Sequence, residues 1–183
     1  SRCAVHQQTQ RTYAIGEGGE GNRALLLLDA NLQVIATLED TGEAPEGYDP
    51  NYEPIQDVAV HGDQVIVLTH TSHPEGSGLR LLDLDGRFLR TIAGGRFQDP
   101  TAVAVSHGRA FVIDNDHDDD DDDEGTGETI LFVIDIQSGD IIQRVHVDLK
   151  GCANAICADG DEIFIAGFEA STVVVLQYAG TEA

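Results

Sequence analysis

The sequence predicts an all-β protein, a β-propeller of four-stranded antiparallel blades, and three observations support this prediction. Short runs rich in Val, Ile, Leu and Phe recur along the whole chain and are bounded by Gly, Asp, Asn or Pro, as strands are. The runs form a cassette that repeats with a period of roughly 40 to 50 residues, which is typical of propeller blades. No stretch of about ten residues has the apolar spacing of a helix.

Each cassette begins with two strands separated by a short polar turn. Four such pairs occur, at residues 3–6 with 12–15, 58–61 with 65–68, 103–106 with 110–113, and 156–159 with 163–166. When the pairs are aligned, the second strands place four residues at equivalent positions: Tyr13, Ile66, Phe111 and Ile163. This self-similarity along the chain predicts the architecture more firmly than local propensity does.

A third strand follows each pair, at residues 25–29, 79–83, 130–135 and 173–178, and a fourth follows in three cases, at 33–38, 87–92 and 140–147. Gly and Asp cluster between consecutive strands, so the chain reverses there and neighbouring strands are antiparallel.

The predicted blades span residues 1–38, 55–93, 101–147 and 153–183 of a single domain, and the last blade lacks its outer strand. An open propeller leaves strand edges and apolar faces uncovered. We therefore expect a partial propeller that further blades or subunits complete, in a homo- or hetero-assembly. The alternative is four blades that close imperfectly.

The third cassette resembles an NHL repeat of a β-propeller, through residues 99–105, 109–115 and 130–135, and residues 84–94 of the second cassette end in the manner of that family. Gluconolactonase-like and TolB-like propellers are related to it and share the same alternation of strands. The resemblance implies a propeller over nearly the whole chain. The sequence departs from the family at 117–128, where a long acidic link replaces a short one of Gly-Asn-His-Arg type.

The chain is strongly acidic. Its 183 residues contain 33 Asp and Glu but only 10 Lys and Arg, which gives a net charge of -23. Nucleic acids and anionic membranes need a basic face, so neither is expected as a partner. No apolar run approaches the ~20 residues of a membrane span. The charge favours cations, basic partners or a salt-rich environment, and we expect an extracellular or periplasmic location.

The acidic run that follows the second strand of the third cassette is a candidate Ca²⁺ site, because Ca²⁺ is bound by clustered carboxylate and amide oxygens. Its candidate ligands are Asp114, Asn115, Asp116, Asp118, Asp120 and Glu124. The run lacks the spaced ligands of an EF-hand, and consecutive carboxylates repel one another. The favoured interpretation is a solvated loop with a diffuse ion cloud, and a third is a docking site for a basic partner.

Three first-strand ends carry metal-binding side chains: His6, His61 and Asp159. First strands line the central channel of a propeller, so these residues are a candidate site for a metal such as Zn²⁺. The favoured interpretation is ordinary turn chemistry, in which each side chain bonds to the turn that follows it.

The three cysteines form no C-x-x-C motif, so a zinc ribbon and a thioredoxin-like site are unsupported. Cys157 lies on a predicted strand and is expected to be a small buried residue. Cys3 is a disulfide candidate with Cys152, or else with Cys157, if the first and last blades are neighbours. Such a bond would imply an oxidising compartment.

No catalytic motif stands out from the acidic background. The sequence therefore predicts a non-enzymatic binding or scaffold module for a protein or a surface polymer, with contacts from the insertions at 40–54 and 114–128. It predicts no cofactor other than Ca²⁺. The alternative is a metal-dependent propeller enzyme, similar to lactonases or lyases, whose site is the channel group.

Overall fold

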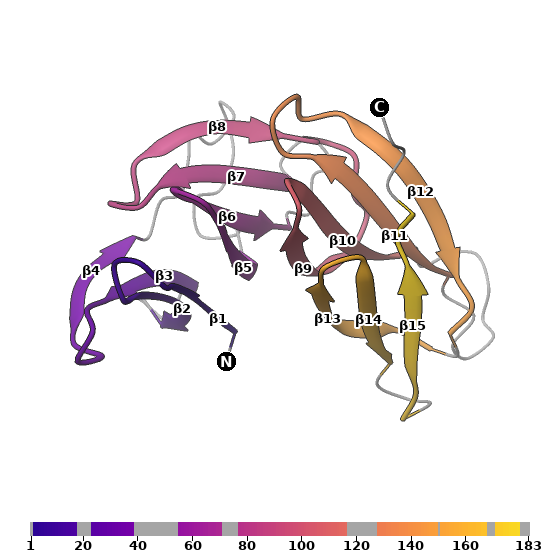
Figure 1. Cartoon of the computed structure of the whole chain (residues 1–183), viewed down its shortest axis with the longest axis horizontal. Coiled ribbons are helices and arrows are strands. Elements are labelled where there is room, and N and C mark those ends of the chain that lie inside the picture. Colours follow the sequence, from indigo (N-terminus) through magenta and orange to yellow (C-terminus); the bar gives the residue numbers. More distant parts are fainter. Residues whose placement is uncertain are drawn as a thin grey trace. The chain divides into compact units, whose positions relative to one another are not determined.

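The computed structural model describes residues 2–17, 23–38, 55–70, 77–116, 128–149, 151–167 and 171–179. These residues form fifteen strands in four antiparallel sheets, in which strands follow one another in chain order, and they include no helix (Figure 1). The chain divides into two compact units, Ser1–Phe97 and Gln98–Ala183. Each unit contains two sheets, which we call blades 1 and 2 and blades 3 and 4.

The first unit holds two four-stranded blades. Blade 1 comprises β1 (Cys3–His6), β2 (Arg11–Glu17), β3 (Arg23–Leu28) and β4 (Val34–Leu38), and blade 2 comprises β5 (Ile55–His61), β6 (Gln64–Thr69), β7 (Gly78–Asp83) and β8 (Phe88–Ile92). One face of each blade is apolar and faces the other blade, so the two share a core that includes Tyr13, Leu25, Leu27, Val58, Val65, Val67 and Leu82.

The second unit holds a four-stranded and a three-stranded blade. Blade 3 comprises β9 (Pro100–Ser106), β10 (Arg109–Asp116), β11 (Glu128–Asp135) and β12 (Ile141–Val147), and blade 4 comprises β13 (Ala153–Asp159), β14 (Glu162–Gly167) and β15 (Val173–Gln177). Their shared core includes Ala102, Phe111, Ile113, Leu131, Val133, Ile163 and Ile165. The predicted absence of a fourth strand in the last blade is confirmed for the described residues.

Strand register corrects one predicted equivalence. Ala104 pairs with Phe111 in blade 3, and Cys157 pairs with Phe164 in blade 4, so Phe164 and not Ile163 is the counterpart of Phe111. The error arose because Ile163 and Phe164 are both apolar, and a shift of one residue exchanges the two faces of a strand. Phe164 therefore points to the opposite face of blade 4 from Ile163.

The two cores define the two faces of a blade. In blades 1 and 3, we call the face that packs on the second blade of the unit the front face; it carries Tyr13 and Phe111. In blades 2 and 4, we call the face that packs on the first blade of the unit the back face; it carries Val65 and Ile163. The registers extend these names to all four blades, because alternate residues of a strand point to opposite faces.

The third strand of each four-stranded blade ends at or just before an aspartate that holds the turn to the fourth strand. Asp29 accepts hydrogen bonds from two turn N–H groups at 2.8 and 2.9 Å, as Asp83 does at 2.9 and 2.8 Å. Asp135 accepts one from the Ser138 N–H at 2.7 Å. Gly86 is required in the second turn, because its φ is +85° and a Cβ there would lie 2.2 Å from Leu38 Cδ1.

Among the described residues, no helix has the length and hydropathy of a membrane span.

Candidate functional site

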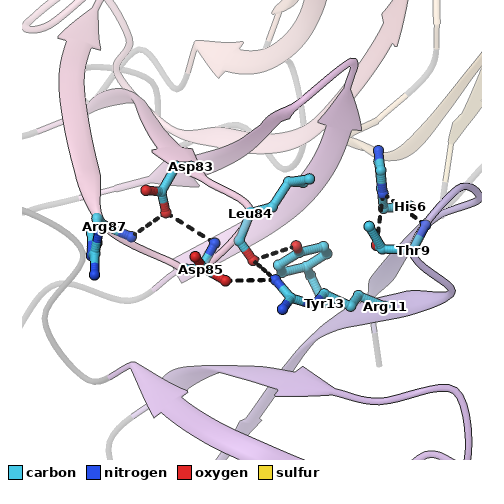
Figure 2. A network of polar contacts seen from close by, with 8 residues as sticks. All are labelled: His6, Thr9, Arg11, Tyr13, Asp83, Leu84, Asp85 and Arg87. Atoms are coloured by element: carbon cyan, nitrogen blue, oxygen red, sulfur yellow. Dashed lines mark hydrogen bonds and ion pairs between the residues drawn. The ribbon is translucent and has the colours of Figure 1, made fainter.

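Polar side chains of blade 1 contact the β7–β8 turn of blade 2 (Figure 2). Tyr13 Oη donates a hydrogen bond to the Leu84 carbonyl at 2.8 Å, and Arg11 donates to the same carbonyl at 2.9 Å and to Asp85 Oδ1 at 2.7 Å. Burial raises the pKa of Tyr13, and the hydrogen bond from Arg11 lowers the pKa of Asp85. These groups hold the two blades together, and the exposed ion pair adds little stability.

A buried network joins blades 3 and 4 around Asn115, which is 2% exposed. Its side-chain amide donates to the Ala153 carbonyl at 3.0 Å, and its side-chain oxygen accepts from the Ala153 N–H at 3.1 Å and from Thr129 Oγ1 at 3.2 Å. Thr101 donates to the same carbonyl at 2.9 Å. One amide side chain thus satisfies both backbone groups of the first residue of β13.

The corresponding position between blades 1 and 2 is bonded in a similar way. Ile55 begins β5 as Ala153 begins β13, and its carbonyl accepts a hydrogen bond from Arg23 at 3.1 Å. In both units, the main chain at the start of a first strand is therefore bonded by a side chain of the preceding blade.

Two of the six predicted Ca²⁺ ligands have protein partners. The Asp114 carboxylate is buried and accepts from the Asp99 N–H at 2.7 Å and from the Gln98 N–H, and Asn115 has the bonds described above. Asp116 ends β10, and its side chain lies outside the described residues, as do Asp118, Asp120 and Glu124. The Ca²⁺ site stays a prediction.

We expect metal-free protein to bind Ca²⁺ weakly, with a dissociation constant of about 1 mM, because a run of adjacent carboxylates offers charge without a fixed ligand geometry. Replacing residues 118–123 by serine should abolish the binding, whereas Asp114→Asn should leave it unchanged because Asp114 already bonds to Gln98 and Asp99. Titration calorimetry after treatment with a chelator measures both. Stoichiometric Ca²⁺ that survives dialysis would contradict this expectation.

The predicted channel residues end their strands as expected, but His6 has a local role. Its Nδ1 lies 2.7 Å from Thr9 Oγ1, and the Thr9 N–H donates to it at 3.3 Å, which confirms turn chemistry at this position (Figure 2). His61 is half-buried and Asp159 is exposed, on β5 and β13 of different units. Among the residues that the structure describes, no group of three or more His, Cys, Asp or Glu could hold a metal ion. The Zn²⁺ site stays a prediction.

The cysteines differ from the prediction in one respect. Cys157 is exposed on the front face of blade 4, so its predicted burial is wrong: the core with blade 3 covers the back face, which carries Ile156 and Ala158. Cys3 is exposed and Cys152 half-buried. No disulfide joins the three residues, all of which the structure describes. Because Cys3 and Cys152 belong to different units, their disulfide stays a prediction.

The fourth strands share an irregularity that the sequence analysis missed. In β4, β8 and β12 the register shifts by one residue, which is a β-bulge. The residue left without a partner is Ile35, Leu89 or Ile142, and each of the three is exposed. The signal was present as an apolar pair near the start of each fourth strand.

No protein-family model and no curated protein matches this chain. Among solved structures, the chain is similar to the WD40 domain of Neurospora crassa Pan2, with 13% identity and a TM-score of 0.66 over 100% of this chain. It is also similar to the Dos1 propeller, with 13% identity and a TM-score of 0.61 over 97% of the chain. The fold is a β-propeller.

Identities this low show the fold of the propeller alone. The chain spans about half the length of these relatives, covering 47% of the Pan2 domain and 44% of the Dos1 propeller. It also resembles the computationally designed Ika4 protein, with 13% identity and a TM-score of 0.57, over 97% of this chain and 90% of that one.

The propeller should lose stability in acid partly through Asp135. The hydrogen bond from the Ser138 N–H lowers the pKa of Asp135 below its ordinary value, and Arg109 pairs with its other oxygen. A lowered folded-state pKa means that the ionised carboxylate stabilises the fold. This contribution is present above the unfolded-state pKa of about 3.9 and is lost as the pH falls through the folded-state pKa.

We therefore expect Asp135→Asn to lower the free energy of unfolding at pH 7 and to flatten its decline below about pH 4. Urea unfolding followed by circular dichroism between about pH 2 and pH 7 measures the effect. The matched control is Asp63→Asn in the exposed β5–β6 turn, which should leave the profile unchanged. Parallel acid profiles for Asp135→Asn and the wild type would refute the assignment.

Proposed function

We propose that this propeller is a non-enzymatic protein-binding or scaffold module of NHL-repeat type, and that each fourth strand carries an aliphatic anchor for a partner. The supporting observation is the recurrence of an exposed aliphatic side chain at the bulges of β4, β8 and β12. Ile35 is 52%, Leu89 48% and Ile142 45% exposed. Single exposed apolar residues are ordinary on a protein surface, but a repeat at one structural position in three blades is not scattered.

The bulges also favour recognition through side chains. A bulge interrupts the ladder of a strand edge and so discourages another chain from adding a strand there. An exposed aliphatic side chain at that place instead offers an anchor for a pocket on a partner. In the first unit, Phe88 lies next to Leu89 and is also exposed, which enlarges the surface.

The charge of the chain suggests the chemistry of the partner. A net charge of -23 favours a protein with a basic rim around an apolar centre, because opposite potentials speed association and exclude acidic competitors. The insertion at 40–54 and the acidic link at 117–127 lie outside the described residues and are proposed as further contacts.

The test compares three purified proteins as baits in extract of the source cells: the wild type, the triple variant Ile35→Ser, Leu89→Ser and Ile142→Ser, and the control Leu32→Ser. Leu32 is 65% exposed in the β3–β4 turn, before β4 begins and outside its bulge. The wild type and the control should recover equal molar amounts of the partner. The amount recovered with the triple variant should be at least about tenfold lower. Equal recovery by all three proteins, with unchanged thermal unfolding, would exclude this surface.

A further inference from the structure

The front face of blade 4 is apolar and uncovered, although its counterparts in the other blades are buried. Val173 is 59% exposed, whereas the equivalent Leu25, Leu79 and Leu131 are 0, 0 and 2% exposed. Val175 is 55% exposed, whereas the equivalent Leu27, Leu81 and Val133 are 3, 0 and 1% exposed. A sheet face of this composition is one that a neighbouring blade normally covers.

The central strands of the same face show the same contrast. Phe164 is half-buried, whereas the equivalent Tyr13, Ile66 and Phe111 are buried completely or nearly so. Cys157 is exposed at the place that Ala59 and Ala104 occupy in blades 2 and 3, where both are buried.

The back face of blade 1 is also apolar and uncovered, and it is the kind of face on which a front face packs. Val5 is 53% exposed. Cys3 is exposed, whereas the equivalent residues of blades 2 and 3, Val58 and Val103, are buried. Leu28 is half-buried, whereas its equivalent in blade 2, Leu82, is fully buried. Within its own unit, blade 4 therefore has no blade against its front face, and blade 1 has none against its back face.

We propose that these two faces pack on each other between two copies of the chain. The front face of blade 4 in one copy covers the back face of blade 1 in the other, in the front-to-back packing that each unit already uses internally. Since each copy offers one face of each kind, two copies form two identical interfaces.

The cysteines provide an independent indication. In the first unit, Ala4 on the front face of blade 1 shares a core with Val58 on the back face of blade 2. Cys157 occupies the position of Ala4, and Cys3 occupies that of Val58. The proposed packing thus places Cys157 of one copy and Cys3 of the other in the same apolar core, at both interfaces. Of the fourth-strand residues proposed above, Leu89 and Ile142 belong to blades 2 and 3 and take no part in this contact.

The first test measures mass and cross-linking. Light scattering of the eluting reduced protein should give twice the monomer mass. Diamide should then convert one Cys3 and one Cys157 thiol into a disulfide, with the two electrons and two protons passing to the diamide. A covalent dimer should appear on a non-reducing gel, persist in Cys152→Ser and be lost in Cys3→Ser and Cys157→Ser.

The second test places a charge on the proposed interface. Val175→Glu should raise the dissociation constant of the dimer at least about 100-fold, because a buried carboxylate without a partner is strongly disfavoured. The control Leu89→Glu alters an aliphatic residue of similar exposure that lies outside the two faces. It should leave the dissociation constant of the dimer unchanged. Circular dichroism checks that both variants fold.

Three results would overturn the proposal. They are a monomeric wild type at all concentrations, a Cys3–Cys157 disulfide formed within one chain, and a dimer that tolerates Val175→Glu. The first two would mean that the faces are covered within one molecule or by another kind of blade. None of them bears on partner binding at β8 and β12, which the double variant Leu89→Ser and Ile142→Ser tests separately, because these strands belong to blades 2 and 3.

Discussion

Replacing Asn115 by alanine is expected to lower the free energy of unfolding by about 3 kcal/mol, because it removes several hydrogen bonds from a dry environment at once. Ala153 is fully buried, and without the Asn115 side-chain oxygen its N–H loses the bond that the structure shows at 3.1 Å. Thr129 also loses an acceptor. Urea unfolding at pH 7, followed by far-ultraviolet circular dichroism, measures the change.

Two comparisons make the Asn115 result specific. Asn31→Ala alters an exposed asparagine in the β3–β4 turn and should change the free energy of unfolding by less than about 0.5 kcal/mol. Added Ca²⁺ should not alter the effect of Asn115→Ala, because the amide bonds to Ala153 and Thr129. If Ca²⁺ stabilised the wild type but not the variant, Asn115 would be a metal ligand as the sequence suggested.

Phe111→Ala is expected to lower the free energy of unfolding by about 4 kcal/mol, the larger of the two effects, because it opens a cavity in the core between blades 3 and 4. Phe111 is 1% exposed, and its ring meets Tyr178 edge to face, with centroids 5.6 Å apart and planes at 76°. The loss removes both the buried area and this aromatic pair. The same urea unfolding measures it.

The matched control for the cavity is Phe88→Ala, which removes the same atoms from a side chain that is 43% exposed on β8. We expect a change of less than about 1 kcal/mol there. If the two substitutions destabilise the protein equally, Phe111 does not have the packing role that the structure gives it. A Phe111→Leu variant should recover about half of the loss, since it refills part of the cavity.

The strands and their order were predictable because both depend on local patterns. Val-rich runs between Gly and Asp turns specify short antiparallel strands, and their repetition specifies four sheets. The register of the last blade was not predictable, since Ile163 and Phe164 are both apolar. A strand with apolar residues on both faces does not show which residue faces the core.

The roles of polar residues were harder to predict. Asp114 and Asn115 lead into an acidic run, so their composition suggested a metal site. The structure shows other partners: Asp114 accepts from the main chain just before β9, and Asn115 bonds to Ala153 of blade 4. Two polar residues directly after an apolar strand can signal such a network, because buried polar groups require hydrogen bonds. The partner Ala153 lies 38 residues away in the chain and has no side-chain feature that identifies it.

The hydrogen bonds from Asn115 to the main chain of Ala153 bear on how propellers of this kind diversify. Asn115 recognises the backbone of Ala153, and in the other unit Arg23 recognises the backbone of Ile55. A strand that is held through its main chain presents the same groups whatever its sequence, so mutation at Ala153 or Ile55 leaves the donor's target in place. Duplication or exchange of a whole blade then needs no matching change in the strand that receives the bond, and the two blade junctions hold the same main-chain position with different donor amino acids.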